Sequence, residues 1–336
     1  MVAVTSRKYA TIREIAVAAG VSTSTVSRAF SRPEMLSPET VARVQQVATD
    51  LAYVPNRSAR ALSTGLQGAI AIVVSDIANP FFPPLIRGIE RCSDAADVLV
   101  LLGDTDETAA KEATLLAKLA HQADGVVLAA PRSDDGELTA LSERFPLVLV
   151  NRELPGVPQV LIDSAAGMTE GVAHLADLGH TRLAYAPGPA GSWANDQRHQ
   201  AIIRAAAERG IEVVVLDNER PTHEAGIALV PKLVESRATA VIAFDDVLGQ
   251  GILAGLGAAG VAVPEQMSVI GCDDTVAARA FPAMTAIAGD NELAGEKAAE
   301  TLLALVRDDD SGDRPEPVVL PTRLVVRDST GPANAG

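Results

Sequence analysis

The stretch TIREIAVAAGVSTSTVSRAF, residues 11–30, decides the first part of the fold. Thr11 and Glu14 stand three residues apart, the spacing at which a threonine caps a helix and the glutamate bonds back to the cap. Gly20 then ends this helix, because glycine adopts the left-handed conformation without steric cost. Ser22 is placed to cap a second helix. The stretch therefore predicts two helices joined by a tight turn.

The second predicted helix, residues 22–30, has an unusual outer face. We expect its inward residues to be Val26, Ala29 and Phe30. The outward residues carry hydroxyl or basic groups, and they are Thr23, Ser24, Thr25, Ser27 and Arg28. Such groups donate hydrogen bonds to phosphates and base edges in a major groove. The face indicates DNA binding; simple solvation of the serines and of Arg28, or an ion pair between Arg28 and Glu34, is the alternative.

The charge of the chain is distributed unevenly. Residues 1–62 contain eight lysines and arginines and four acidic residues, a local charge of +4, whereas the rest carries −19, for a total of −15. This first segment also contains a third predicted helix, which Ser37 caps, which has Pro38 at its first position and which runs to about Ala52. A basic head on an acidic body is typical of a protein that holds DNA at one end.

From residue 68 onward the pattern changes to short apolar runs that alternate with helical stretches, which is typical of parallel α/β sheets. The first group of predicted strands is 69–74, 98–102, 125–129 and 147–150. The second group is 183–186, 212–216, 240–244 and 268–271. Polar residues cluster just after several of these strands, where open α/β sheets bind ligands. The body is therefore expected to hold a small-molecule site.

The run from residue 11 to residue 63 resembles the DNA-binding headpiece of the lactose and galactose repressor (LacI/GalR) family. The matching segments are Ile15-Ala16, Ala19-Gly20-Val21-Ser22, Thr25-Val26-Ser27-Arg28, Leu51-Ala52-Tyr53-Val54-Pro55-Asn56 and Ala59-Arg60-Ala61-Leu62. The resemblance implies that residues 22–30 form the recognition helix. It implies base contacts from Thr23, Ser24 and Arg28, and phosphate contacts from Ser22, Thr25, Ser27 and Asn56.

In the same family, the linker after the headpiece becomes helical on operator DNA. The resemblance therefore implies that Ala59 and Leu62 reach the minor groove and that Leu62 wedges between base steps, which bends the duplex. Anchoring of Leu62 on the body is the alternative.

The resemblance extends through the body, with matches at residues 79–82, 179–182, 246–251, 269–274 and 321–327. It implies two lobes like those of periplasmic sugar-binding proteins, closing on an effector. The residues carried over as effector contacts are Asn79, Phe82, Asn151, Arg152, Trp193, Arg198, Asp246 and Asp273. Carboxylates and amides would bind hydroxyl groups and aromatic rings would stack on a sugar, so a carbohydrate is the leading effector class. The family's usual asparagine before Asp246 is Asp245 here.

The sequence thus predicts an α/β protein with an all-α helix-turn-helix headpiece (1–55), a hinge (56–67), a two-lobed body with parallel sheets (68–330) and a disordered tail (331–336). The predicted function is a DNA-binding transcriptional regulator, a repressor, that binds a palindromic double-stranded operator as a homodimer. A nucleoside or small acid acting as co-repressor, or a sensor that only binds solutes, is the alternative.

Other classes of protein are disfavoured by missing patterns. The sequence lacks a secretory signal and an apolar run long enough for a bilayer, so we expect a cytoplasmic, nucleoid-associated protein without a membrane partner. It also lacks a phosphate-binding glycine loop, a nucleophile elbow and a metal-ligand cluster, and therefore we expect no enzyme activity, no cofactor and no metal. Two distant cysteines, Cys92 and Cys272, fit a reducing compartment.

Overall fold

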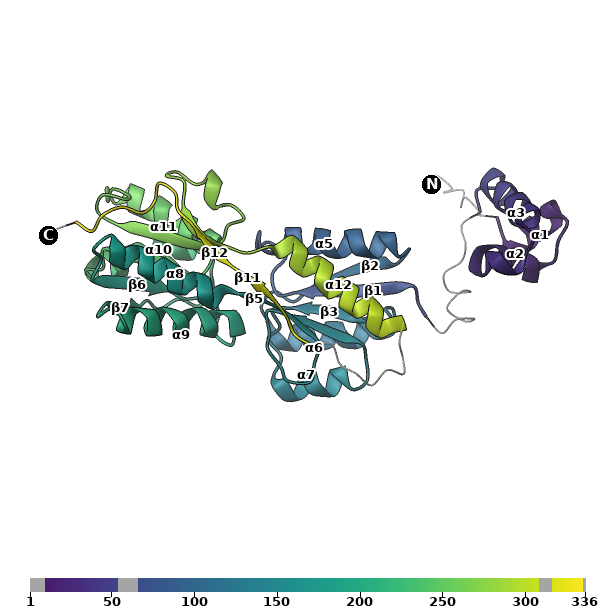
Figure 1. Ribbon diagram of the computed structural model, residues 1–336, viewed down its shortest axis with the longest axis horizontal. Helices are drawn as coiled ribbons and strands as arrows, with labels where there is room; N and C mark the ends of the chain where they lie inside the picture. Colours follow the sequence, from purple (N-terminus) through teal and green to yellow (C-terminus); the bar gives the residue numbers. More distant parts are fainter. Residues whose placement is uncertain (1–9, 54–65, 308–315, 335–336) are drawn as a thin grey trace, which may run out of the picture. The chain divides into compact units, whose positions relative to one another are not determined.

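The computed structural model describes residues 10–53, 66–307 and 316–334. The chain divides into two compact units, Met1–Gln67 and Gly68–Gly336, which we describe separately (Figure 1). The predicted hinge residues Asn56, Ala59 and Leu62 lie outside the described residues. The predicted fold class, helices in the first unit and parallel sheets in the second, is confirmed. Among the described helices, none is both long enough and apolar enough to cross a membrane.

The described part of the first unit is a small helical bundle. Its elements are α1 (Ile12–Ala19), α2 (Thr23–Ser31), the short 3-10 turn η1 (Pro33–Met35) and α3 (Pro38–Asp50). The predicted capping box is present, because the backbone N–H of Thr11 donates to Glu14 Oε2 at 2.6 Å and the N–H of Glu14 donates to Thr11 Oγ1. Gly20 ends α1 with φ +66°. Local capping therefore sets where these helices begin and end.

The core of this unit is built from small and branched side chains. Ile15, Val26 and Val44 are fully buried where the three α-helices meet. The expectation that Phe30 is buried is wrong: the residue is 36% exposed, and its ring centre lies 5.8 Å from that of Tyr53. Val26 and Ala29 fill the inward side of α2, and Phe30 lies at the edge of that face.

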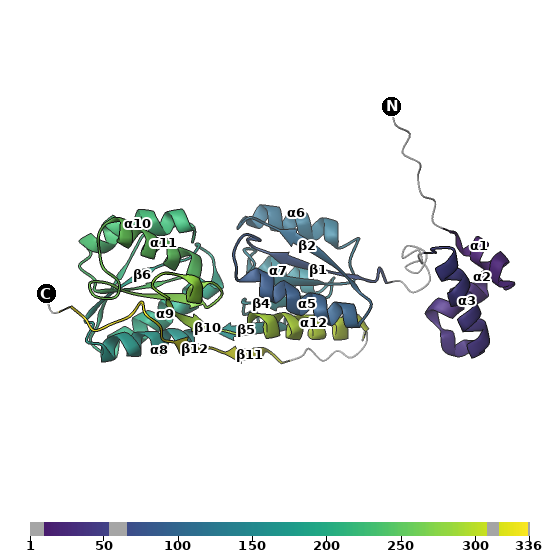
Figure 2. The same cartoon turned by 90° about the horizontal axis from the view of Figure 1, so that it is seen from above.

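The first lobe of the second unit is a sheet with strand order β2-β1-β3-β4-β5-β11, parallel throughout. Its strands are β1 (Ala69–Val74), β2 (Leu99–Asp104), β3 (Val126–Ala129), β4 (Leu147–Val150), β5 (Gln159–Asp163) and β11 (Val318–Pro321). Helices α5 (Phe82–Ala95) and α12 (Asn291–Arg307) cover one face, and α6 (Ala109–Leu119) and α7 (Asp135–Ser142) cover the other (Figure 2). Alternate residues of β1 serve the two faces: Ile70 and Ile72 pack under α5, and Ala71 and Val73 pack under α6.

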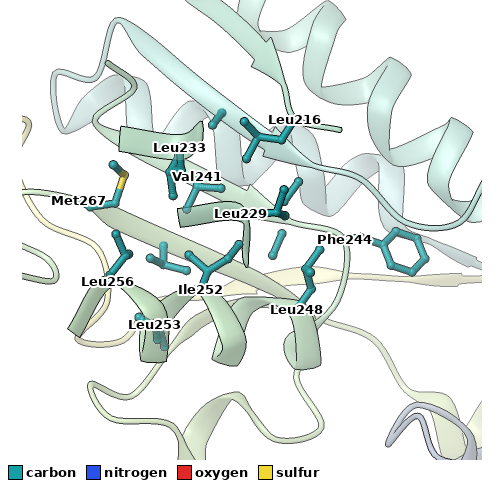
Figure 3. Packing of buried hydrophobic residues seen from close by; sticks show 14 of the residues in the cluster. Leu216, Leu229, Leu233, Val241, Phe244, Leu248, Ile252, Leu253, Leu256 and Met267 are labelled. Atoms are coloured by element: carbon teal, nitrogen blue, oxygen red, sulfur yellow. The ribbon is translucent and has the colours of Figure 1, made fainter. Parts of the chain in front are cut away.

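The second lobe repeats this arrangement with strand order β7-β6-β8-β9-β10-β12. Its strands are β6 (Arg182–Ala186), β7 (Glu212–Val215), β8 (Ala240–Ala243), β9 (Ser268–Asp273), β10 (Thr285–Ala288) and the antiparallel β12 (Arg323–Val325). Helices α8 (Ser164–Asp177) and α9 (Trp193–Ala207) cover one face, and α10 (His223–Glu235) and α11 (Asp246–Ala258) cover the other. A short 3-10 turn, η2 (Ala277–Arg279), follows β9. Leu233, Leu248 and Ile252 fill the core under α10 and α11 (Figure 3).

Helices α10 and α11 approach one another so closely that only glycine fits at the contact. A Cβ atom on Gly251 would lie 2.0 Å from the carbonyl oxygen of His223, and one on Gly226 would lie 2.4 Å from the carbonyl oxygen of Leu248. Both neighbours are backbone atoms, which cannot move aside as a flexible side chain can. The packing of this helix pair therefore depends on two glycines.

The chain passes between the lobes where β5 leads into α8, where β10 leads into α12 and where β11 leads into β12. The strands at these passages, β5, β10, β11 and β12, are absent from the sequence predictions. Each has three to five residues. Runs as short as TAIA in β10 carry too little periodicity to be distinguished from loop. Tertiary pairing with neighbouring strands defines them instead.

The end of the chain is ordered as far as it is described. Gly331 donates its N–H to Ser268 Oγ at 3.1 Å, and its carbonyl lies 3.1 Å from Nε2 of the buried His180. The N–H of Ala333 donates to the carbonyl of Leu178. The expected disordered tail from residue 331 is therefore wrong for residues 331–334, because their backbone groups bond to the second lobe; residues 335–336 lie outside the described residues.

Candidate functional site

The outer face of α2 is exposed as the sequence predicts. Thr23, Ser24, Ser27 and Arg28 are all exposed to solvent. Ser22 caps the helix, since its Oγ accepts the N–H of Thr25 at 3.1 Å, and the two hydroxyls lie 2.9 Å apart. Thr25 is half-buried as a result. Ser22 and Thr25 thus position the start of the helix, and the exposed side chains of Thr23, Ser24, Ser27 and Arg28 lie along its outer face.

Arg28 is the charged residue of α2. The described residues place no acidic side chain within ion-pair distance of its guanidinium, so the alternative pair with Glu34 does not form. An exposed guanidinium with five donors suits bidentate bonding to a guanine edge or to a phosphate. The arrangement leaves Arg28 available for such a contact.

A cavity of about 40 Å³ lies in the second unit, where the carboxyl ends of strands from both sheets meet. Five of the predicted effector residues line it: Asn79, Phe82, Asn151, Arg198 and Asp273. They come from the segments after β1 and β4, from α5 and α9, and from the end of β9. The structure therefore brings together side chains from both lobes that are up to 194 positions apart in the sequence.

Arg198 is the central polar group of this cavity. Its side chain is only 4% exposed; Nη2 donates to Asp273 Oδ1 at 2.8 Å and Nη1 donates to the carbonyl of Phe244. The guanidinium also lies over the Phe244 ring, 4.6 Å from its centre. Its Nε is buried without a hydrogen-bond partner among the described residues. Burying a donor without a hydrogen-bond partner costs free energy. The Nε–H of Arg198 is therefore suited to donate a hydrogen bond to a ligand.

Asn151 and Asn79 present amides to the cavity from the first lobe. Asn151 has a left-handed backbone, φ +51°, and its Oδ1 accepts the N–H of Ile162 at 3.0 Å, which fixes the direction of the side chain. Asn79 Oδ1 accepts the N–H of Phe81, and its Nδ2 donates across the lobe boundary to Asp245 Oδ2 at 2.9 Å. The lobes are thus in direct contact beside the cavity.

Asp245 is the buried N-cap of α11, accepting the N–H of Leu248 at 2.8 Å. Burial, followed by the nearby carboxylate of Asp273, raises its pKa to about 7. A second cross-lobe contact lies at the surface, where Arg220 pairs with Asp106 at 2.7 Å. These contacts hold the lobes together over a space that has room for a few water molecules.

The other three predicted effector residues, Asp246, Arg152 and Trp193, do not line the cavity. Asp246 Oδ2 instead accepts the N–H groups of residues 275–277 at 2.7–3.2 Å, which shapes the loop after β9. Burial, with Asp273 as the second cause, raises the Asp246 pKa to about 7. Arg152 pairs with Asp135 at 2.6 Å, and Trp193 packs against the core of the second lobe.

The cavity also holds residues that the sequence analysis missed. They are Ser75, Phe81, Glu107, Ala130, Arg132, Ser192, Ala194, Pro221 and Phe244. Glu107 and Arg132 form an ion pair with a distance of 2.5 Å, and their side chains are 15% and 8% exposed. Both follow strands of the first lobe, β2 and β3, as Asn79 follows β1. The signal that identified Asn79 could therefore have identified them.

Two family models match the chain. Residues 11–56 match "Bacterial regulatory proteins, lacI family", and residues 172–330 match a periplasmic binding protein-like domain. The regulator DegA of Bacillus subtilis (strain 168) is 33% identical over 337 residues, covering 96% of this chain and 99% of DegA. The similarity thus spans both units.

Solved structures show the same arrangement of elements. The transcriptional regulator CelR in complex with cellobiose is 31% identical, with a TM-score of 0.70 over 95% of this chain and 99% of that one. The lac repressor dimer bound to operator and the anti-inducer ONPF has a TM-score of 0.86 at 23% identity, over 96% of this chain and 100% of that one, and supports the fold alone.

Proposed function

The chain belongs to the LacI family of helix-turn-helix transcriptional regulators, and on that premise we propose that it is a repressor whose operator binding is controlled by a carbohydrate held between its lobes. One observation carries the effector half of the proposal: five predicted contact residues from both lobes converge on a single cavity around the buried Arg198–Asp273 pair. CelR, a relative by structure, was solved with cellobiose in complex.

The operator is bound by the exposed face of α2 in this proposal. Thr23, Ser24 and Arg28 contact base edges, while Ser22, Thr25, Ser27 and Asn56 contact phosphates. The hinge residues Ala59 and Leu62 enter the minor groove. A homodimer places two such helices about 34–36 Å apart on a palindromic operator.

An apolar surface of the second lobe suits the dimer contact. Leu253, Gly257, Val261 and Pro282 line a groove of about 330 Å³, and Phe281 beside them is 97% exposed. An aromatic ring so exposed next to an apolar groove is typical of an interface. In a two-fold dimer the same surface of both copies is used, so Phe281 and the groove face their counterparts.

Effector control follows from the contacts between the lobes. A sugar does not fit in about 40 Å³, so it enters only when the Asn79–Asp245 and Arg220–Asp106 contacts separate. A ligand that binds one lobe geometry better than another shifts the balance between them. Coupling of this kind is typically about 1–3 kcal/mol, or a 5–150-fold change in operator affinity.

The proposal includes no catalytic step, cofactor or metal, and it has the protein act in the cytoplasm, on the nucleoid. The relatives are transcriptional regulators. A regulator that responds to a nucleoside or a small acid is the second candidate; it is favoured by Arg198, whose unpartnered Nε could bond a carboxylate as well as a hydroxyl.

The test combines operator selection with ligand addition. Binding-site selection from random duplex DNA with the full chain should yield a palindrome, and sugars should change the affinity of that palindrome about 5–150-fold. Asp273→Asn should weaken the sugar response and leave DNA binding without ligand intact. Recovery of no preferred sequence would reject the operator half, and a response unchanged in Asp273→Asn would reject the site.

A further inference from the structure

The cavity between the lobes contains two arginine–carboxylate pairs, one from each lobe. Arg132 pairs with Glu107 on the first lobe, and Arg198 pairs with Asp273 on the second. All four side chains line the cavity and are at most 15% exposed. Among the described lining residues these are the charged ones, and their charges cancel.

The first-lobe pair is held rigidly. Arg132 Nε and Nη2 both lie 2.5 Å from Glu107 Oε2, and Nη1 donates to the carbonyl of Ala130 at 2.8 Å. The backbone N–H groups of Arg132 and Ser133 each donate to the buried carboxylate of Glu112 at 3.0 Å. The guanidinium therefore has little freedom to leave Glu107 for a ligand.

Some polar atoms at the cavity remain available. Glu107 Oε1 receives no hydrogen bond from any described residue, and no described residue accepts from Asn151 Nδ2. On the second lobe, the donor Nε of Arg198 is buried and unpartnered. The site thus presents acceptors and donors without an excess of positive charge. A hydroxyl group, which both donates and accepts, satisfies such a set.

We infer that the effector is an uncharged, hydroxyl-bearing molecule, and that Glu107 is the specificity-determining residue that excludes carboxylates and phosphates, with Arg132 as its positioning residue. This inference rests on the proposed function and narrows its effector class. In this largely buried cavity an anionic ligand would be repelled by the carboxylates of Glu107 and Asp273. To bind an arginine, it would have to break one of the buried arginine–carboxylate pairs. A neutral polyol needs neither.

Matched ligands that differ in charge test the inference. Calorimetric titration of the full chain would compare cellobiose with cellobionate, D-glucose with D-glucuronate, and D-ribose with ribose 5-phosphate. The tightest binder should be neutral and should bind at least about ten-fold more tightly than its acidic counterpart. An acidic member that binds more tightly, or no neutral member with a Kd below about 1 mM, would overturn the inference.

Charge variants then test the role of Glu107. Glu107→Gln leaves Arg132 unpaired, so the preference for the neutral member should fall about ten-fold or more. The double variant Glu107→Gln/Arg132→Gln removes both charges and should restore that preference, which a merely structural role would not produce. Glu212→Gln breaks the exposed Arg182–Glu212 pair of the second lobe and serves as the control. An unchanged preference in Glu107→Gln, with its melting temperature near that of wild type, would refute the assignment.

Operator binding measured in the same samples separates the two proposals. If an acidic member changes operator affinity and its neutral counterpart does not bind, the regulator proposal holds and this inference fails. If a neutral member binds as expected but no ligand changes operator affinity, the inference holds and effector control of DNA binding fails.

Discussion

The side-chain amide of Asn79 in the first lobe donates to Asp245 Oδ2 in the second lobe, with an N–O distance of 2.9 Å. The acceptor carboxyl is buried and also caps α11 through the N–H of Leu248. One carboxyl group therefore serves both the start of the helix and the contact between the lobes.

Asp245→Asn should make the protein relatively more stable at high pH. Burial raises the Asp245 pKa to about 7 in the folded chain, above its value of 3.8 in water. The stability that this group contributes is therefore present at low pH and is lost as pH rises through about 7. The asparagine variant should gain about 1–3 kcal/mol of unfolding free energy relative to wild type between pH 5 and pH 8, measured by urea denaturation.

The exposed Asp217 supplies the control for this experiment, because Asp217→Asn should follow the wild-type pH profile. If the unfolding free energies of Asp245→Asn and wild type changed in parallel with pH, ionisation of the Asp245 carboxyl would not cost the folded protein stability.

His180→Gln should reduce the loss of stability in acid. His180 is buried, lies 2.7 Å from Thr239 Oγ1 through Nδ1 and contacts Gly331 through Nε2; burial lowers its pKa. Because the folded pKa is below 6.5, the unfolded chain binds protons more readily, and wild-type stability falls as pH drops below about 6.5. The variant should lose less stability between pH 7 and pH 5.5, by up to about 1 kcal/mol.

His121 is exposed and gives the matched control. Its replacement by glutamine should leave the loss of stability between pH 7 and pH 5.5 unchanged. The prediction fails if His121→Gln and His180→Gln change that loss equally. Asp245 and His180 have opposite effects on stability in overlapping pH ranges, so each is measured as a difference between its variant and wild type.

Gly251→Ala should destabilise the second lobe strongly. The new methyl carbon would lie 2.0 Å from the carbonyl oxygen of His223, so α10 and α11 must move apart. We expect a loss of at least about 2–3 kcal/mol of unfolding free energy by thermal or urea denaturation. Gly171, a helical glycine of α8 whose Cβ would have its nearest contact at 3.4 Å, is the control. Gly171→Ala should be neutral or stabilise by about 0.5–1 kcal/mol; equal losses in the two variants would contradict the explanation.

Arg28→Ala should weaken specific operator binding and relax base preference at one position in each half-site. A bidentate arginine–guanine contact is worth about 1–3 kcal/mol of discrimination. Competition gel shifts against single-base operator variants measure this directly. Arg43→Ala, at an exposed position of α3, should leave the base preference unchanged. A loss of affinity in Arg28→Ala that is equal for all operator variants would assign Arg28 to phosphate contact instead.

Much of the fold could be predicted because its signals are local. Thr11, Glu14 and Gly20 define α1 through capping alone, and β1 is a six-residue apolar run that is buried along its whole length. The short strands β5 and β10 could not be predicted, because pairing with distant strands makes them. Local sequence patterns therefore predict the elements that form from local signals, and they miss those that depend on tertiary pairing.

The cavity between the lobes shows the same division. The resemblance implied Asn79 and Asn151, which also follow buried strands, and both line the cavity. The resemblance implied Asp246, but its carboxyl accepts N–H groups of the loop at residues 275–277, and the neighbouring Asp245 makes the contact with Asn79. Glu107 lies in an acidic run after β2 that resembles a solvated loop, and only the structure shows its partner, Arg132.

The passages of the chain between the lobes have a mechanical consequence. Within the described residues, the lobes are joined at Asp163–Ser164, between Ala288 and Asn291, and between Pro321 and Arg323, all of them short. Three short connections limit how far the lobes can separate, so the relative movement left to them is mainly rotation. Under the proposed function, a ligand that contacts both lobes would therefore change the angle between them rather than the distance between them.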